Sequence, residues 1–139
     1  MILADASAWV EYDRASESPV EQRLSELIAT EGPLAISEPV VVEIVAGART
    51  VEREVDLRRL LLRFHLLRFD PAADFYGAAN IYRQCRRVGV TPRGLIDCMV
   101  AAVAHRYGAI LLAHDAEMSR IANVVGIQMD PASLTPDAW

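Results

Sequence analysis

The sequence contains no lysine and only two cysteines, and it has no long hydrophobic run. Cys85 and Cys98 fall within predicted helices, so we interpret them as reduced thiols rather than as a disulfide. The absence of an apolar run of about 18 residues argues against a membrane-spanning helix. No basic segment precedes the short apolar run at the N-terminus, which argues against a secretion signal. We therefore expect a cytoplasmic protein with no membrane association.

Internal repeats, low-complexity segments and linkers rich in Pro, Gly or Ser are also missing from the sequence. We expect residues 1–139 to form a single domain. A domain of this size buries roughly 68 to 70% of the surface that its unfolded chain exposes, so it needs no disulfide to hold a core. The aromatic residues do not form a base-stacking set, and the spacing of His65 and His105 is not typical of a zinc site.

Charge is distributed unevenly along the chain. The formal net charge of -5 taken alone argues against a nucleic-acid partner, because phosphate binding usually requires a basic surface. However, residues 49–93 contain ten arginines and only five acidic residues. Several of these arginines lie in a predicted helix over 51–64, where we expect them to form a solvent-exposed face. Guanidinium groups pair bidentately with phosphate. The negative net charge therefore does not exclude a nucleic-acid partner.

Short apolar segments alternate with segments of helical periodicity along the whole chain. The predicted strands cover residues 1–4, 34–36, 65–69, 109–113 and 124–129. The main predicted helices cover residues 19–30, 51–64, 71–88, 94–107 and 116–122, with further helices starting after residue 5 and near residue 38. This alternation implies a parallel sheet covered by helices. We therefore expect an α/β fold with three α/β/α layers around a central, mostly parallel sheet.

Two acidic residues, Asp5 and Asp115, come just after predicted strands, in the segments "ILAD" and "AILLAHD". In open parallel sheets, binding crevices form at the carboxyl ends of the strands. Both residues therefore stand where a functional site is expected. The alternative for each is a helix N-cap, for which Asp is a favoured residue.

Two further acidic residues, Glu43 and Asp97, interrupt helices that are otherwise apolar, "PVVVEIVAG" and "GLIDCMVAAVA". A carboxylate buried there must be paired, protonated or bound to a metal, whereas a solvent-facing position or an ion pair with an arginine is the simpler alternative. Four acids in one crevice would repel each other unless divalent cations were bound. Oxygen ligands suit Mg²⁺ or Mn²⁺, and such ions support phosphodiester hydrolysis.

The order and spacing of these segments resemble the PIN domains, and among them the VapC toxins of type II toxin-antitoxin systems. The resemblance spans nearly the whole chain: the strand ending in Asp5 with Ser7 behind it, the "EPVVVEIVAG" helix, and the "RGLIDCMVAAVAHRYGAILLAHD" block. It implies that Asp5, Glu43, Asp97 and Asp115 hold one or two Mg²⁺ or Mn²⁺ ions, with a metal-bound water attacking RNA. It also implies a transfer or ribosomal RNA substrate, a cognate VapB-type antitoxin that neutralises the toxin in a heteromeric complex, and a homodimer.

Three further residues are secondary candidates. Ser7 matches a position where the family commonly has a small polar residue supporting the metal ligands, although it is equally an ordinary helix-start hydroxyl. Glu117 stands where the family often has Asp, and the helix dipole alone also favours an acid there. Arg93 lies just before the Asp97 helix. Its guanidinium group could contact an RNA phosphate or the acidic residues, and the alternative is an ordinary surface arginine. Ala113 replaces the hydroxyl residue that the family often has, which weakens the expected support of the metal ligands.

Two other functions are alternatives to a metal-dependent endoribonuclease. One is a non-catalytic PIN-like module that binds RNA or a protein without cutting. The other is an aspartyl-phosphate phosphatase or a receiver domain. Both of the latter rely on an active-site lysine, which this chain lacks, and the phosphatases need a second Asp where Ser7 stands.

Overall fold

Four short parallel strands form the centre of the structure, a computed structural model that describes residues 1–136. They are β1 (Ile2–Ala4), β2 (Leu34–Ile36), β3 (His65–Leu66) and β4 (Ile110–Leu112), arranged in the order β3-β2-β1-β4. The central strand β1 pairs in parallel with both β2 and β4, and Ala4 lies opposite Leu112. The prediction of a central, mostly parallel sheet is confirmed.

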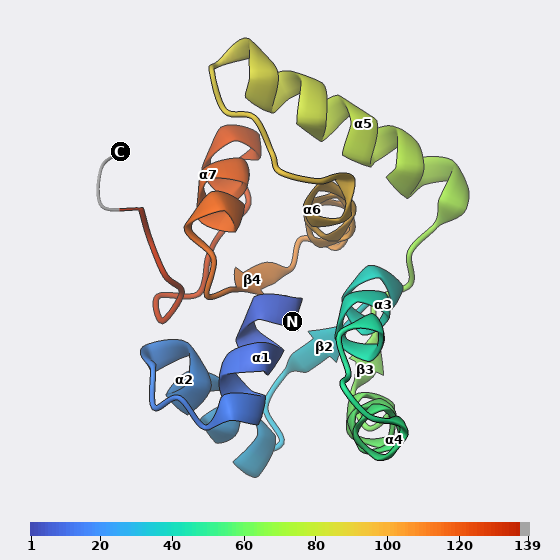
Figure 1. Ribbon diagram of the computed structural model, residues 1–139. Coiled ribbons are helices and arrows are strands. Elements are labelled where there is room, and N and C mark those ends of the chain that lie inside the picture. The colour runs from blue at the N-terminus through green and yellow to red at the C-terminus, as the bar shows by residue number, and fades with distance from the viewer. Residues whose placement is uncertain (137–139) are drawn as a thin grey trace.

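Seven helices surround this sheet within the described residues. They are α1 (Ala6–Arg14), α2 (Pro19–Ala29), α3 (Glu38–Ala46), α4 (Val51–Leu61), α5 (Pro71–Arg87), α6 (Leu95–Tyr107) and α7 (Ala116–Val125). Figure 1 shows α5, α6 and α7 gathered on one side of the sheet and α1 and α2 on the other, with α3 and α4 beside β2 and β3. The three-layer α/β/α prediction is therefore also confirmed.

The core lies where α6 packs against the sheet. Helix α6 buries its residues from Val100 to Ala104, and the strand residues Leu3 and Leu111 are completely buried. Strands covered on both faces must be apolar at every position, which explains why β1 reads as a continuous apolar run instead of an alternating one. Cys85 and Cys98 are both buried and free, in agreement with their interpretation as reduced thiols.

The predicted strand over residues 124–129 is wrong. Helix α7 continues through Val125 and ends at Gly126, whose φ of 79° places it in the left-handed region that favours glycine. Beyond it, Met129 makes only an isolated parallel bridge with Leu111. The apolar pair Val124-Val125 packs against the core as the last turn of an amphipathic helix, which a short apolar run cannot distinguish from a strand.

The predicted strand over residues 65–69 is shortened to two exposed residues, His65–Leu66. Its neighbour Leu67 donates its backbone N–H to Ile36 before the chain leaves the edge of the sheet. Within residues 1–136, none of the helices is long and apolar enough to cross a membrane.

Candidate active site

The carboxyl ends of β1 and β4 bring Asp5 and Asp115 to the same edge of the sheet. The backbone N–H of Asp5 donates to the Leu112 carbonyl oxygen at 2.9 Å, so the two strand ends are directly joined. Each acid also caps the helix that follows it, Asp5 for α1 and Asp115 for α7. The capping alternative and the site alternative are therefore compatible at both positions, because one carboxylate oxygen suffices for a cap.

Ser7 fixes the side chain of Asp5. Its hydroxyl donates to Asp5 Oδ2 at 2.8 Å and accepts the backbone N–H of His114 at 2.9 Å. The hydroxyl thus links the chain leaving β1 to the chain leaving β4. Ser7 is therefore more than a helix-start hydroxyl: it orients one carboxylate of the site and ties two segments that are far apart in the sequence.

Asp5 is only 3% exposed, yet half of its carboxylate has no protein partner. Oδ1 is buried and accepts no hydrogen bond from residues 1–136, while Oδ2 is held by Ser7. A buried carboxylate oxygen without a donor is costly. Such an atom marks a position where another group, such as a cation, is expected to bind.

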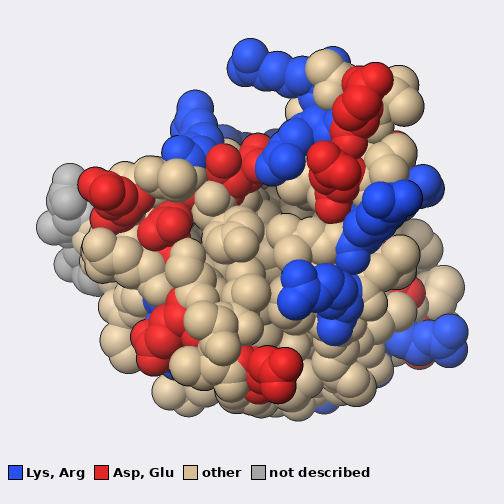
Figure 2. Space-filling view, turned by 90° about the horizontal axis from the view of Figure 1, so that it is seen from below, with Lys and Arg blue, Asp and Glu red and all other residues tan. Residues whose placement is uncertain are grey.

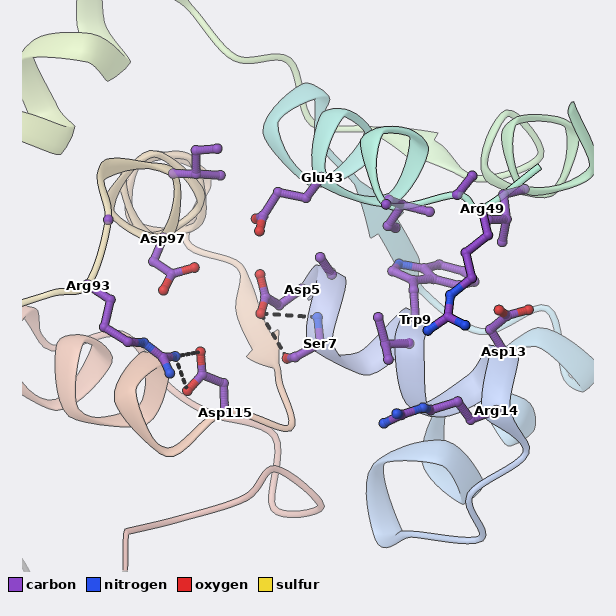
Figure 3. Close-up of a pocket in the computed structure, with 18 of the residues that line it drawn as sticks. Asp5, Ser7, Trp9, Asp13, Arg14, Glu43, Arg49, Arg93, Asp97 and Asp115 are labelled. Carbon is purple, nitrogen blue, oxygen red and sulfur yellow. Dashed lines mark hydrogen bonds and ion pairs between the residues drawn. The ribbon is translucent and has the colours of Figure 1, made fainter. Parts of the chain in front are cut away.

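Glu43 and Asp97 reach the same place from helices α3 and α6. Asp5, Glu43 and Asp97 each offer a carboxylate oxygen, and these oxygens all lie within 4.8 Å of one another. Glu43 Oε1 is also buried and has no hydrogen-bond partner in the described part of the chain. In Figure 3 the three carboxylates point toward a common space between α1, α3 and α6.

The electrostatics of this group favour a bound cation. Burial, followed by the charges of Asp5, Asp115, Glu43 and Glu117, raises the pKa of Asp97 to about 7. Burial is also the main cause that raises the pKa of Asp5 and the pKa of Glu43 above their usual values. Without a cation, Asp97 is therefore partly protonated near neutral pH, and protons bind to Asp5 and Glu43 more readily than to exposed carboxylates. A divalent ion would replace those protons and satisfy the unpartnered oxygens.

Arg93 contacts the acidic residues at the start of α7, Asp115 and Glu117. Its Nη2 donates to both carboxylate oxygens of Asp115, at 3.1 and 2.9 Å, as Figure 3 shows. Its Nε forms an ion pair with Glu117, and its backbone N–H donates to Glu117 Oε1 at 2.8 Å. Asp97, Asp115 and Glu117 also offer oxygens within 4.8 Å of one another. Of the two sequence alternatives, a role near the acids fits Arg93 better than an ordinary surface arginine.

The acids stand at one end of a groove of about 1200 Å³. Its lining includes the four acids and, farther along, Arg14, Arg49 and Arg53. Arg53 forms an ion pair with Asp13. Trp9 also lines the groove, and Figure 3 shows it between Asp5 and Arg49. Figure 2, turned by 90° from Figure 1, shows acidic and basic side chains lying next to one another on one face of the molecule.

Arg14, Arg49 and Arg53 line the groove but are not among the site residues that the sequence predicts. The arginines of residues 51–64 are solvent-exposed, as predicted, and Arg53 in addition lines the groove and contacts α1 through Asp13. The available signal was the position of Arg49 and Arg53, which flank the N-cap Thr50 just after the helix that carries Glu43. Helical periodicity alone did not reveal that the first turn of α4 faces α1.

The chain is similar in sequence to two mycobacterial ribonucleases over nearly their whole length. It is 41% identical over 129 residues to a VapC ribonuclease of Mycobacterium bovis. The matched region covers 92% of this chain and 96% of that relative. It is also 41% identical over 129 residues to Ribonuclease VapC11 of Mycobacterium tuberculosis, with the same coverage.

Solved structures share the fold. VapBC2 of Rickettsia felis, bound to a promoter DNA fragment, matches with a TM-score of 0.71 and 20% identity, over 94% of this chain and 98% of that one. VapC20 of Mycobacterium tuberculosis, described as a sarcin-ricin loop cleaving toxin, matches with a TM-score of 0.65 and 16% identity, over 86% and 93% of the two chains. The sequence pattern of the PIN domain covers residues 2–124. The chain therefore belongs to the PIN-domain family.

Proposed function

We propose that this protein is a divalent-metal-dependent endoribonuclease that acts as the toxin of a VapBC-type toxin-antitoxin pair. The observation that carries the proposal is the group formed by Asp5, Glu43 and Asp97, in which two buried carboxylate oxygens have no partner within residues 1–136. The relatives named VapC ribonuclease support the reaction and the biological role.

The donor set fits Mg²⁺ or Mn²⁺. All candidate ligands are carboxylate oxygens, which hard divalent cations prefer, and the part of the chain that the structure describes offers no nitrogen or sulfur ligand in either acidic group. Bound at these residues, such an ion would activate water and neutralise charge on a phosphodiester. Asp5, Glu43 and Asp97 would hold it, Asp115 would add negative charge beside it, and Ser7 would keep Asp5 oriented.

The basic end of the groove supports RNA as the substrate. Arg14, Arg49 and Arg53 lie along the same groove as the acids, so a chain of phosphates could contact arginines while one phosphodiester reaches the acids. These contacts would position the RNA backbone without reading its sequence. Whether the RNA is transfer or ribosomal RNA depends on contacts beyond these residues.

The proposed partner is a VapB-type antitoxin. Solved VapBC complexes share the fold of this chain, which supports a heteromeric complex. We also propose that this complex is cytoplasmic. We also propose that the chain is a single PIN domain that forms a homodimer. A groove that carries both acids and arginines suits a partner segment bearing charges of both signs.

The direct test is RNA cleavage by purified protein with Mg²⁺ or Mn²⁺. Asp97→Asn and Asp5→Asn should each lower the cleavage rate at least about 100-fold, because each removes a candidate ligand charge. Asp56→Asn is the matched control, since Asp56 is exposed on α4, outside the groove, and should keep wild-type activity. Cleavage that persists in both site variants and in EDTA would contradict the proposal. RNA binding without cleavage would instead favour the non-catalytic module.

A further inference from the structure

The acidic residues form two overlapping groups that differ in what already neutralises them. Asp5, Glu43 and Asp97 make up the open group, and Asp97, Asp115 and Glu117 make up the paired group. The open group contains Asp5 Oδ1 and Glu43 Oε1, both buried and without a partner in the described chain. The paired group contains the two carboxylates that Arg93 contacts. Glu117 Oε2 is also buried and accepts no hydrogen bond from the described residues, but unlike the two oxygens of the open group it forms an ion pair with Arg93.

Arg93 is attached to the paired group by both its side chain and its backbone. The guanidinium group donates to Asp115 through Nη2 and pairs with Glu117 through Nε. The backbone N–H donates to the other oxygen of Glu117 at 2.8 Å. Charge-assisted bonds to two carboxylates at once fix the position of a guanidinium group better than one exposed ion pair does.

The paired group is itself rigid. Asp115 caps α7, and its Oδ1 accepts the backbone N–H of Glu117 at 3.0 Å. The Glu117 side chain is only 12% exposed and the Asp115 side chain 19%. Neither carboxylate is free to turn away from Arg93 without losing these contacts. A divalent ion bound by Asp115 and Glu117 would have to displace the guanidinium group, because like charges repel at this distance.

We propose that Arg93 acts as a built-in cation at the paired group, so that the protein binds a single divalent ion, at the open group. This inference rests on the proposed function, because it concerns the same site. It assigns Glu117 as a positioning residue that holds Arg93, not as a metal ligand. Asp115 then contributes through its charge and through its bond to Arg93.

The test is the number of Mn²⁺ ions bound per chain, measured from the electron paramagnetic resonance signal of free Mn²⁺ or by calorimetry. Wild-type protein should bind one ion. Arg93→Gln should bind two, because Asp115 and Glu117 lose their cation, whereas Arg93→Lys should still bind one because it keeps a positive charge. The double variant Arg93→Gln with Glu117→Gln should return to one ion, which would place the second ion at the paired group.

Arg83→Gln is the matched control. Arg83 is exposed on α5, away from the groove, so this variant should bind one ion. The Arg93 side chain is 71% exposed, so its replacement should leave the fold intact, as a thermal melt would verify. Two ions in the wild type, or one ion in Arg93→Gln, would overturn this inference but leave the proposed function standing. A wild type that binds no ion would overturn both.

Discussion

Asp5 and Asp74 are both aspartates, both lie at the start of a helix, and both are almost completely buried, at 3% and 2% exposed. Asp74 is fully paired: it accepts the backbone N–H of Asp70 at 2.7 Å and two bonds from Arg106, at 2.9 and 2.7 Å. Asp5 is held on one oxygen by Ser7, and its other oxygen faces further acids.

The pKa values of Asp74 and Asp5 are shifted in opposite directions. At Asp74, burial would raise the pKa, but the hydrogen bonds from Arg106 and Asp70 outweigh it, so the pKa is lowered. At Asp5, burial and the charge of Asp115 outweigh the hydrogen bonds from Ser7, so the pKa is raised. Burial alone therefore does not identify a functional carboxylate. What identifies it is burial without a compensating protein cation.

Asp74 has a structural role that the sequence did not reveal. Arg106 joins it from α6 and also donates to the carbonyl oxygen of Arg68 at 2.6 Å. One arginine thus ties α6 to the start of α5 and to the segment before it. This connection holds the helix that carries Asp97 in place, at some distance from the groove.

The largest expected difference between the two sites is in stability without metal. Asp74→Asn should lower the free energy of unfolding by about 2–3 kcal/mol, because it leaves Arg106 with a neutral partner. Asp5→Asn should leave stability unchanged or raise it, because it removes a buried charge from an acidic group. Urea unfolding in EDTA measures both, and a larger loss for Asp5→Asn than for Asp74→Asn would contradict the comparison.

With divalent ions present, the Asp5 variant and not the Asp74 variant should differ from wild type in how much the ion stabilises it. At about 100 times its dissociation constant, a bound ion stabilises the native state by about 2.7 kcal/mol. Mn²⁺ should therefore raise the melting temperature of wild type and of Asp74→Asn by similar amounts, and leave that of Asp5→Asn nearly unchanged. Differential scanning fluorimetry over a Mn²⁺ titration gives this shift. An equal shift in Asp5→Asn would show that the ion binds elsewhere.

The smallest expected effect is on the pH dependence of stability. The pKa of Asp97 rises from 3.8 to about 7 on folding. Proton binding at Asp97 therefore stabilises the metal-free native state, and this contribution is complete below about pH 4. It is lost as the pH rises through about 7. In EDTA, the wild type should lose several degrees of melting temperature between about pH 5 and about pH 8. Asp97→Asn should show a flatter profile. Asp74 has the opposite sign, because its lowered pKa contributes stability that is lost toward acid pH.

Much of the fold followed from local patterns. The apolar segments before Asp5 and Asp115 form the central strands, because a strand covered on both faces must be apolar throughout. The predicted strand over 124–129 failed, because Val124 and Val125 satisfy the burial pattern of a helix end as well as that of a strand. Only the turn at Gly126 and the packing of α7 show that these residues end a helix instead of forming a strand.

The sequence by itself determined which acids stand at strand ends or inside apolar helices, since these are properties of neighbouring residues. Only the tertiary structure decided which of them are left without a cation. Asp74 is paired because Arg106, 32 positions later in the chain, lies against it, and Asp115 is paired because Arg93, 22 positions earlier, lies against it. Asp5, Glu43 and Asp97 meet because β1, α3 and α6 converge on one edge of the sheet. Charge interactions fall off with distance in space, not along the chain, so the difference between a structural and a functional carboxylate appears only after folding.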